Sequence, residues 1–160
     1  LIVLFLIVSV FMRIMPFAPN FTPLLSIALL SGLYTKNKYF VILPISIMLV
    51  SDIIIGNHVT AFWVYTSLVI IFMLGYFVNR STYFQILQYS IFSALIFFIV
   101  SNFGVWVTGG YVFDFNGLLS CYIAAIPFFK NTLISTCLFS VSIHFVINSI
   151  PALYKKIRVN

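Results

Sequence analysis

Apolar side chains run almost without interruption along this chain, in segments separated by short polar turns. The runs are continuously apolar and do not alternate with a period of two, which indicates helices rather than the strands of a membrane barrel. We therefore predict an all-α integral membrane protein with six transmembrane helices in a single domain, residues 1–160. The six predicted spans are residues 1–15, 21–34, 39–55, 61–78, 83–101 and 131–150.

Residues 102–130 do not fit this simple pattern. They contain a loop rich in glycine and aromatic residues, followed by a short apolar run at 118–129. That run would rise only about 18 Å as a helix, which is too short to cross a bilayer. Pro127 near its end also argues against an uninterrupted helix. We predict a short re-entrant or outer-face helix at 118–129, before the last span.

The composition excludes a soluble globule and a disordered chain. Hydrophobic residues make up 63% of the 160 residues and charged residues 6%, whereas soluble domains average about 45–50% and about 25%. So few charges cannot cover a water-facing surface, and so apolar a chain is not disordered. At roughly 20 residues for each span, no room remains for a separate soluble domain.

The net charge of +6 is explained by membrane topology rather than by nucleic-acid binding, because the basic residues lie singly or in pairs between apolar runs. With six crossings and both termini in the cytoplasm, Lys36, Arg80 and the tail 155–158 face the cytoplasm, and Arg13 and Lys130 lie outside. We predict a multi-pass protein of the bacterial inner membrane, surrounded by the lipid bilayer, with no nucleic-acid partner.

The unusual polar and aromatic residues gather on the predicted outer side of the membrane. Polar groups that converge beside aromatic side chains are typical of a small-molecule pocket, so we expect a ligand-binding site there. Its candidate residues are Asn20, Asp52, His58, Asn102, Trp106, Tyr122 and Asn131.

Asp52 is the strongest single signal, because it lies three residues before the end of an apolar segment. A carboxylate at membrane depth is costly and normally forms an ion pair or lines a cavity. Arg13 lies at a similar distance from the outer end of the first segment, so an Arg13–Asp52 ion pair would neutralise both groups. A ligand-contacting carboxylate and a purely structural ion pair between helices both remain open.

Neither a metal site nor an active site is expected. His58 and His144 lie far apart in the chain, and the two cysteines form no CxxC pair, whereas transition metals need two or three suitable ligands together. The sequence contains no GxSxG, HExxH or phosphate-binding loop. We predict a non-enzymatic protein with no cofactor and no catalytic residues.

Ala28 and Gly32 form a small-xxx-small pair in the second segment. Such spacing lets helix backbones approach closely. We predict that this face packs against another helix, either within the protein or in a membrane protein partner.

Several motifs, taken together, resemble a known family. The most specific are Asn-Phe-Gly-Val-Trp at 102–106 and Pro-Phe-Phe-Lys-Asn-Thr-Leu at 127–133, supported by the stretches at 20–23, 51–58, 64–65 and 74–75. In order and spacing these resemble a bacterial membrane family of unknown function, domain-of-unknown-function family 6580. The resemblance covers nearly the whole chain and implies no established activity.

The layout is also similar to the S components of energy-coupling-factor transporters, small six-helix proteins with both ends inside and a ligand pocket closed by outer loops. This resemblance implies a binding and uptake subunit that docks on a membrane partner. An Ala-xxx-Ala-type docking face is missing from residues 1–12, and Ala28 and Gly32 are the candidates to replace it.

Two functions therefore follow from the sequence. The first is a small-molecule binding and uptake subunit, which needs an energising partner because the chain has no ATP-binding motif. The alternative is a structural accessory subunit of a larger membrane complex, respiratory or photosynthetic, in which the polar residues would form interface hydrogen bonds.

Overall fold

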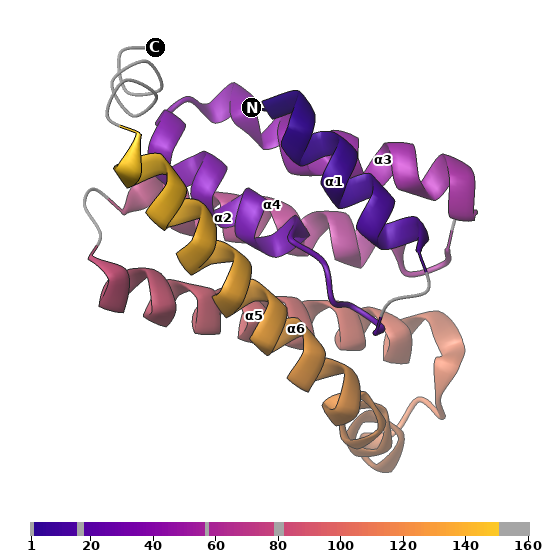
Figure 1. The fold of residues 1–160 in the computed structure, drawn as a ribbon. Coiled ribbons are helices and arrows are strands. Elements are labelled where there is room, and N and C mark those ends of the chain that lie inside the picture. Colours follow the sequence, from indigo (N-terminus) through magenta and orange to yellow (C-terminus); the bar gives the residue numbers. More distant parts are fainter. Residues whose placement is uncertain (1, 16–17, 57, 79–81, 151–160) are drawn as a thin grey trace.

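The chain folds into helices joined by short connections in a computed structural model, which describes residues 2–15, 18–56, 58–78 and 82–150 (Figure 1). A short 3-10 turn, η1 (Lys38–Val41), leads into α3, and a π-helical stretch, η2 (Trp106–Gly110), follows α5. The described residues form no strand. The α-helices are α1 (Ile2–Ile14), α2 (Leu24–Thr35), α3 (Ile42–Ile55), α4 (Ala61–Phe77), α5 (Tyr83–Val105) and α6 (Phe115–Ser149).

The predicted all-helical architecture is confirmed, and within the part of the chain that the structure describes three stretches are long and apolar enough to cross a membrane. These are Lys38–Ile55, Tyr83–Gly110 and Phe115–Ser149. The helices α2 and α4 are shorter, with 12 and 17 residues. At 1.5 Å for each residue α2 rises only about 18 Å, against a hydrocarbon core of about 30 Å. Six complete crossings are therefore not confirmed.

The prediction of a separate short helix at 118–129 is wrong. Instead α6 runs for 35 residues from Phe115 to Ser149, with Pro127 inside it. Proline removes one backbone hydrogen bond, but membrane helices tolerate it where neighbouring groups compensate. Figure 1 shows the first turns of α6 almost end-on and the remainder lying across the view, so the helix changes direction along its length. Proline is a common cause of such bends.

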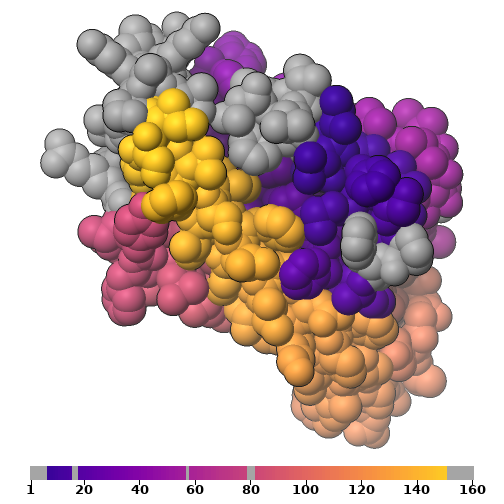
Figure 2. All heavy atoms as spheres, in the orientation of Figure 1, coloured from indigo at the N-terminus to yellow at the C-terminus, as the bar shows by residue number. Residues whose placement is uncertain are grey.

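Residues 102–130 consequently form the end of a helical hairpin rather than an irregular excursion. The helix α5 continues to Val105, η2 extends it to Gly110, and Asp114 caps the start of α6 by accepting a hydrogen bond from the backbone N–H of Gly117 at 2.6 Å. A 35-residue helix is about 52 Å long. The orange part of α6 accordingly projects beyond the indigo α1 (Figure 2).

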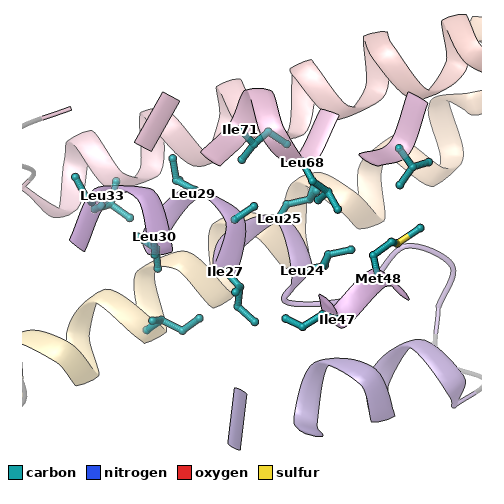
Figure 3. Close-up of a cluster of buried hydrophobic side chains, with 14 of the residues drawn as sticks. Leu24, Leu25, Ile27, Leu29, Leu30, Leu33, Ile47, Met48, Leu68 and Ile71 are labelled. Carbon is teal, nitrogen blue, oxygen red and sulfur yellow. The ribbon is translucent and has the colours of Figure 1, made fainter. Parts of the chain in front are cut away.

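The core of the molecule surrounds α2, where every residue from Leu24 to Leu33 is buried. Its most extensive packing is against α4, and it also contacts α3, α5 and α6. Figure 3 shows side chains of α2 pointing towards its neighbours on several sides. A helix buried around its whole circumference lies at the centre of a bundle.

Two glycines allow α2 and α4 to approach closely. A methyl group at Gly32 would lie 2.8 Å from the backbone nitrogen of Tyr76, and one at Gly75 would lie 3.0 Å from that of Leu33. Ala28, one turn before Gly32, is completely buried. The small-residue face of α2 therefore packs against α4 within the protein.

Polar and apolar side chains are distributed as in a protein surrounded by lipid. Several buried serines and threonines hydrogen-bond inside the bundle; Ser26, for example, donates to the carbonyl of Thr136 at 2.9 Å and so joins α2 to α6. Large apolar side chains instead lie on the outside: Ile53 is 82% exposed and Phe77 75% exposed. Small polar residues between helices are typical of membrane bundles.

The structure describes some of the basic residues from which the topology was predicted. Lys36 donates hydrogen bonds through Nζ to the carbonyls of Gly75, Tyr76 and Val78 at the end of α4. A lysine at this position satisfies carbonyls that a helix leaves unpaired. Arg80 and the tail 155–158 lie outside the described residues, so their cytoplasmic position stays a prediction.

Candidate functional site

Asp52 joins three helices at one end of the bundle. Arg13, in the last turn of α1, forms an ion pair with it, with Nη2 and Oδ1 3.1 Å apart. Tyr65 of α4 donates its hydroxyl hydrogen to the other carboxylate oxygen, Oδ2, at 2.9 Å. Both oxygens of the Asp52 side chain are therefore engaged, one by a positive charge and one by a neutral donor.

Burial makes this arrangement necessary for both charged groups. The side chain of Asp52 is 8% exposed and that of Arg13 is 17% exposed. An isolated charge in such surroundings is strongly destabilising, whereas a paired and hydrogen-bonded charge is tolerated. Arg13 also donates through Nη1 to the sulfur of Met48, which lies at the edge of the core cluster in Figure 3.

A pocket of about 260 Å³ lies directly beside the ion pair. Its wall is built from the end of α1, the α1–α2 connection, the start of α2, α3, the α3–α4 connection and facing residues of α4, α5 and α6. Arg13 is part of the wall, whereas Asp52 is not among the lining residues. The polar lining side chains are Arg13, Asn20, Thr22, His58 and Thr132.

Three of the four methionines in the chain, Met12, Met15 and Met48, contribute to the apolar part of the wall. Methionine is flexible and polarizable, and it is common on binding surfaces that adapt to their ligand. Phe97 of α5 adds an aromatic ring. The pocket therefore combines a large adaptable apolar surface with a few polar groups, as small-molecule sites do.

The α1–α2 connection is held in place by α6. Asn20 has a positive φ of 61°, a conformation that asparagine adopts more readily than most residues. Its carbonyl accepts a hydrogen bond from the Ser135 hydroxyl at 3.4 Å, and Asn131 donates through Nδ2 to the carbonyl of Pro19 at 3.1 Å. Asn131 thus fixes a lining segment of the pocket from outside it.

His58 reaches the pocket from the α3–α4 connection. Gly56 ends α3 with a positive φ of 106° and turns the chain. The carbonyl of His58 then accepts from the N–H of Ala61 at the start of α4. The imidazole is partly buried and lines the pocket.

The remaining candidates lie in the α5–α6 hairpin and not in the pocket wall. Tyr122 donates its hydroxyl hydrogen to the carbonyl of Ile99 at 2.7 Å, which ties α6 to α5. The Nε1–H of Trp106 donates to the carbonyl of Val112 at 3.1 Å. Asn102 donates to Phe98 of its own helix. The structure therefore separates these three residues from Asn20, Asp52 and His58.

Sequence reasoning missed Thr132 and the methionines as parts of the site, and it did not connect Tyr65 with Asp52. The contact between Tyr65 and Asp52 could have been predicted from their depth in the membrane. Tyr65 lies one turn inside the start of α4, and Asp52 lies one turn inside the end of α3. The methionines gave no such signal, because apolar residues in an apolar chain do not stand out.

The arrangement is suited to binding and shows no chemistry for metal coordination. Among the residues that the structure describes, no three His, Cys, Asp or Glu side chains come together. Cys121 is buried and donates to the carbonyl of Asn102, and Cys137 is a free thiol. The absence of metal, cofactor and catalysis stays a prediction.

Comparison with known proteins identifies the family of the chain. Neither a curated protein nor a solved structure matches it, so the likeness to S components also stays a prediction. A family model described as a family of unknown function, DUF6580, matches residues 1–156, nearly the full length of the chain. The chain therefore belongs to the DUF6580 family, as its motifs predicted.

Proposed function

We propose that this protein is a non-enzymatic, small-molecule-binding subunit of the bacterial inner membrane that takes part in uptake. The observation that carries the proposal is the pocket of about 260 Å³ beside the Arg13–Asp52 pair. Its volume lies just below the 300–1,000 Å³ typical of sites for drug-sized ligands. The ligand is accordingly a compact molecule.

The proposed orientation places this pocket on the outer face, with six passes through the membrane and both termini in the cytoplasm. The α1–α2 and α3–α4 connections, which line the pocket, would then be exoplasmic. The α2–α3 turn with Lys36 would be cytoplasmic, in keeping with the preference of basic residues for that side. The short α2 would be shielded from lipid by the helices around it.

Uptake would require a membrane partner or an ion gradient as a source of energy. The pocket, lined by both polar and apolar side chains, supports the binding role. The alternative, an accessory subunit of a larger complex, predicts instead that side chains of a partner fill this pocket. The S components of energy-coupling-factor transporters are the proposed architectural analogy for such a subunit.

A pocket-blocking variant provides the test. Ala18 is exposed and lines the pocket, so Ala18→Trp should fill part of the cavity without disturbing the core. Ala124→Trp places the same side chain at an exposed position of α6 outside the pocket and serves as the control. Purified protein is screened against soluble metabolite-sized compounds by thermal shift. We expect compounds that stabilise the wild type and Ala124→Trp but not Ala18→Trp; equal stabilisation of all three would reject the pocket as the site.

A further inference from the structure

We propose that the pocket receives a molecule with one anionic group and an apolar body, and that Arg13 binds the anionic group. The inference rests on the proposed function, since it names the ligand class of the same pocket. The observation that carries it is that only one partner of the Arg13–Asp52 ion pair faces the pocket. Arg13 lines the pocket, whereas Asp52 does not.

The pocket wall accordingly presents a positive charge without a negative one. No acidic side chain is among the described residues that line it. Only two acidic residues exist in the chain, and the second, Asp114, caps the start of α6. An anion entering the pocket would therefore meet a guanidinium and neutral polar groups.

Arg13 retains the capacity to bind a second anion. A guanidinium carries five N–H donors in a planar fork. The described contacts use Nη2 for Asp52 and Nη1 for the sulfur of Met48, and each of these nitrogens carries two hydrogens. Asp52 in turn is held by Tyr65, so it keeps a hydrogen-bond partner when Arg13 turns towards a ligand.

The rest of the wall defines the other part of the ligand. Met12, Met15 and Phe97 offer apolar contact, and Asn20 and Thr22 offer neutral polar groups. A strongly hydrated polyanion would lose its water against this surface without compensation. A single carboxylate, or a similar monoanion, on an apolar body matches both parts of the wall.

Two sources supply this chemistry, a soluble organic acid and the headgroup of an anionic lipid. The test uses protein in phosphatidylcholine nanodiscs and a series of matched pairs that differ only in charge, from propionate and propionamide to 3-phenylpropionate and its amide. We expect at least one acid to bind about ten times more tightly than its amide, which corresponds to about 1.4 kcal/mol.

Variants of the ion pair separate binding from structure. Asp52→Asn removes the carboxylate that competes for Arg13 and should strengthen binding of the acid several-fold. The double variant Arg13→Gln/Asp52→Asn leaves no unpaired charge, and it should lose the preference for acid over amide. Repetition in nanodiscs with phosphatidylglycerol, at an ionic strength that screens the repulsion between the acid and the anionic bilayer, identifies the source. Unchanged affinity assigns a soluble acid, and weakened affinity assigns a lipid headgroup in the same anion site.

The inference is overturned if no acid in the series binds, if each amide binds as tightly as its acid, or if the double variant keeps the preference. In those cases, neutral compounds that stabilise the wild type but not Ala18→Trp would leave the proposed function standing. If no compound distinguishes wild type from Ala18→Trp, the proposed function fails as well.

Discussion

Arg13 and Asp52 are 39 residues apart in the sequence, yet their side chains meet at 3.1 Å and join α1 to α3. Both are largely buried, and each neutralises the other. Among the described helices, α1 packs mainly on α3, so this pair is a principal attachment of α1. Since α1 also forms one wall of the pocket, the ion pair links the stability of the bundle to the shape of the site.

Removal of one partner of this pair should destabilise the protein more than removal of both. Arg13→Gln leaves Asp52 buried without its counter-charge and should cost about 3 kcal/mol, whereas Arg13→Gln/Asp52→Asn should cost about 1 kcal/mol. Unfolding of the two single variants and the double variant in detergent gives the coupling energy directly. Additive effects of the two single substitutions would show that the charges do not interact.

Tyr65 should contribute through its hydroxyl group alone. The Tyr65→Phe substitution keeps the ring but removes the donor to Asp52 Oδ2, and it should lower stability by about 1.5–3 kcal/mol, as for other hydrogen bonds to charged groups. Tyr39→Phe is the matched control, because Tyr39 is 72% exposed. A thermal melt in detergent compares the two, and an equal effect of both substitutions would contradict the hydrogen bond described here.

Gly75 should not tolerate even one added methyl group. Its α-carbon faces the backbone of Leu29 and Leu33 on α2, so Gly75→Ala forces the two helices apart and should cost about 1–3 kcal/mol, despite the better helix propensity of alanine. Ala124→Leu adds more volume at an exposed position of α6 and should be neutral. Stability measured in detergent would refute this packing if Gly75→Ala were neutral too.

The sequence predicted the helices well where hydrophobic length and turn residues agreed. The predicted segments at 39–55 and 61–78 correspond closely to η1 with α3 and to α4. The last helix was mispredicted because the run at 118–129 is too short to cross alone and Pro127 was taken as a break, whereas α6 continues through it. Sequence alone does not show whether neighbouring helices compensate for the lost hydrogen bond.

The site could be predicted only where a residue was chemically unusual in an apolar chain. Asp52 and Arg13 stood out as charges, and the structure brings them together. Asn102 and Trp106 stood out equally, yet the Asn102 side chain bonds within α5 and Trp106 bonds to the α5–α6 connection, because polarity does not reveal which direction a side chain takes. The three methionines come together in the pocket wall because α1 packs on α3, and no local sequence pattern encodes that packing.

The most direct test of the outer-facing pocket is thiol labelling from outside the membrane. Ala18 is exposed and lines the pocket, whereas Thr136 of α6 is buried and lies beside Ser26. Each is replaced by cysteine in a background with Cys121→Ala and Cys137→Ala, and whole cells are treated with a small membrane-impermeant thiol reagent. We predict that Ala18→Cys is labelled and Thr136→Cys is not; an unreactive Ala18→Cys, or equal labelling of both, would contradict a pocket open to the outer face.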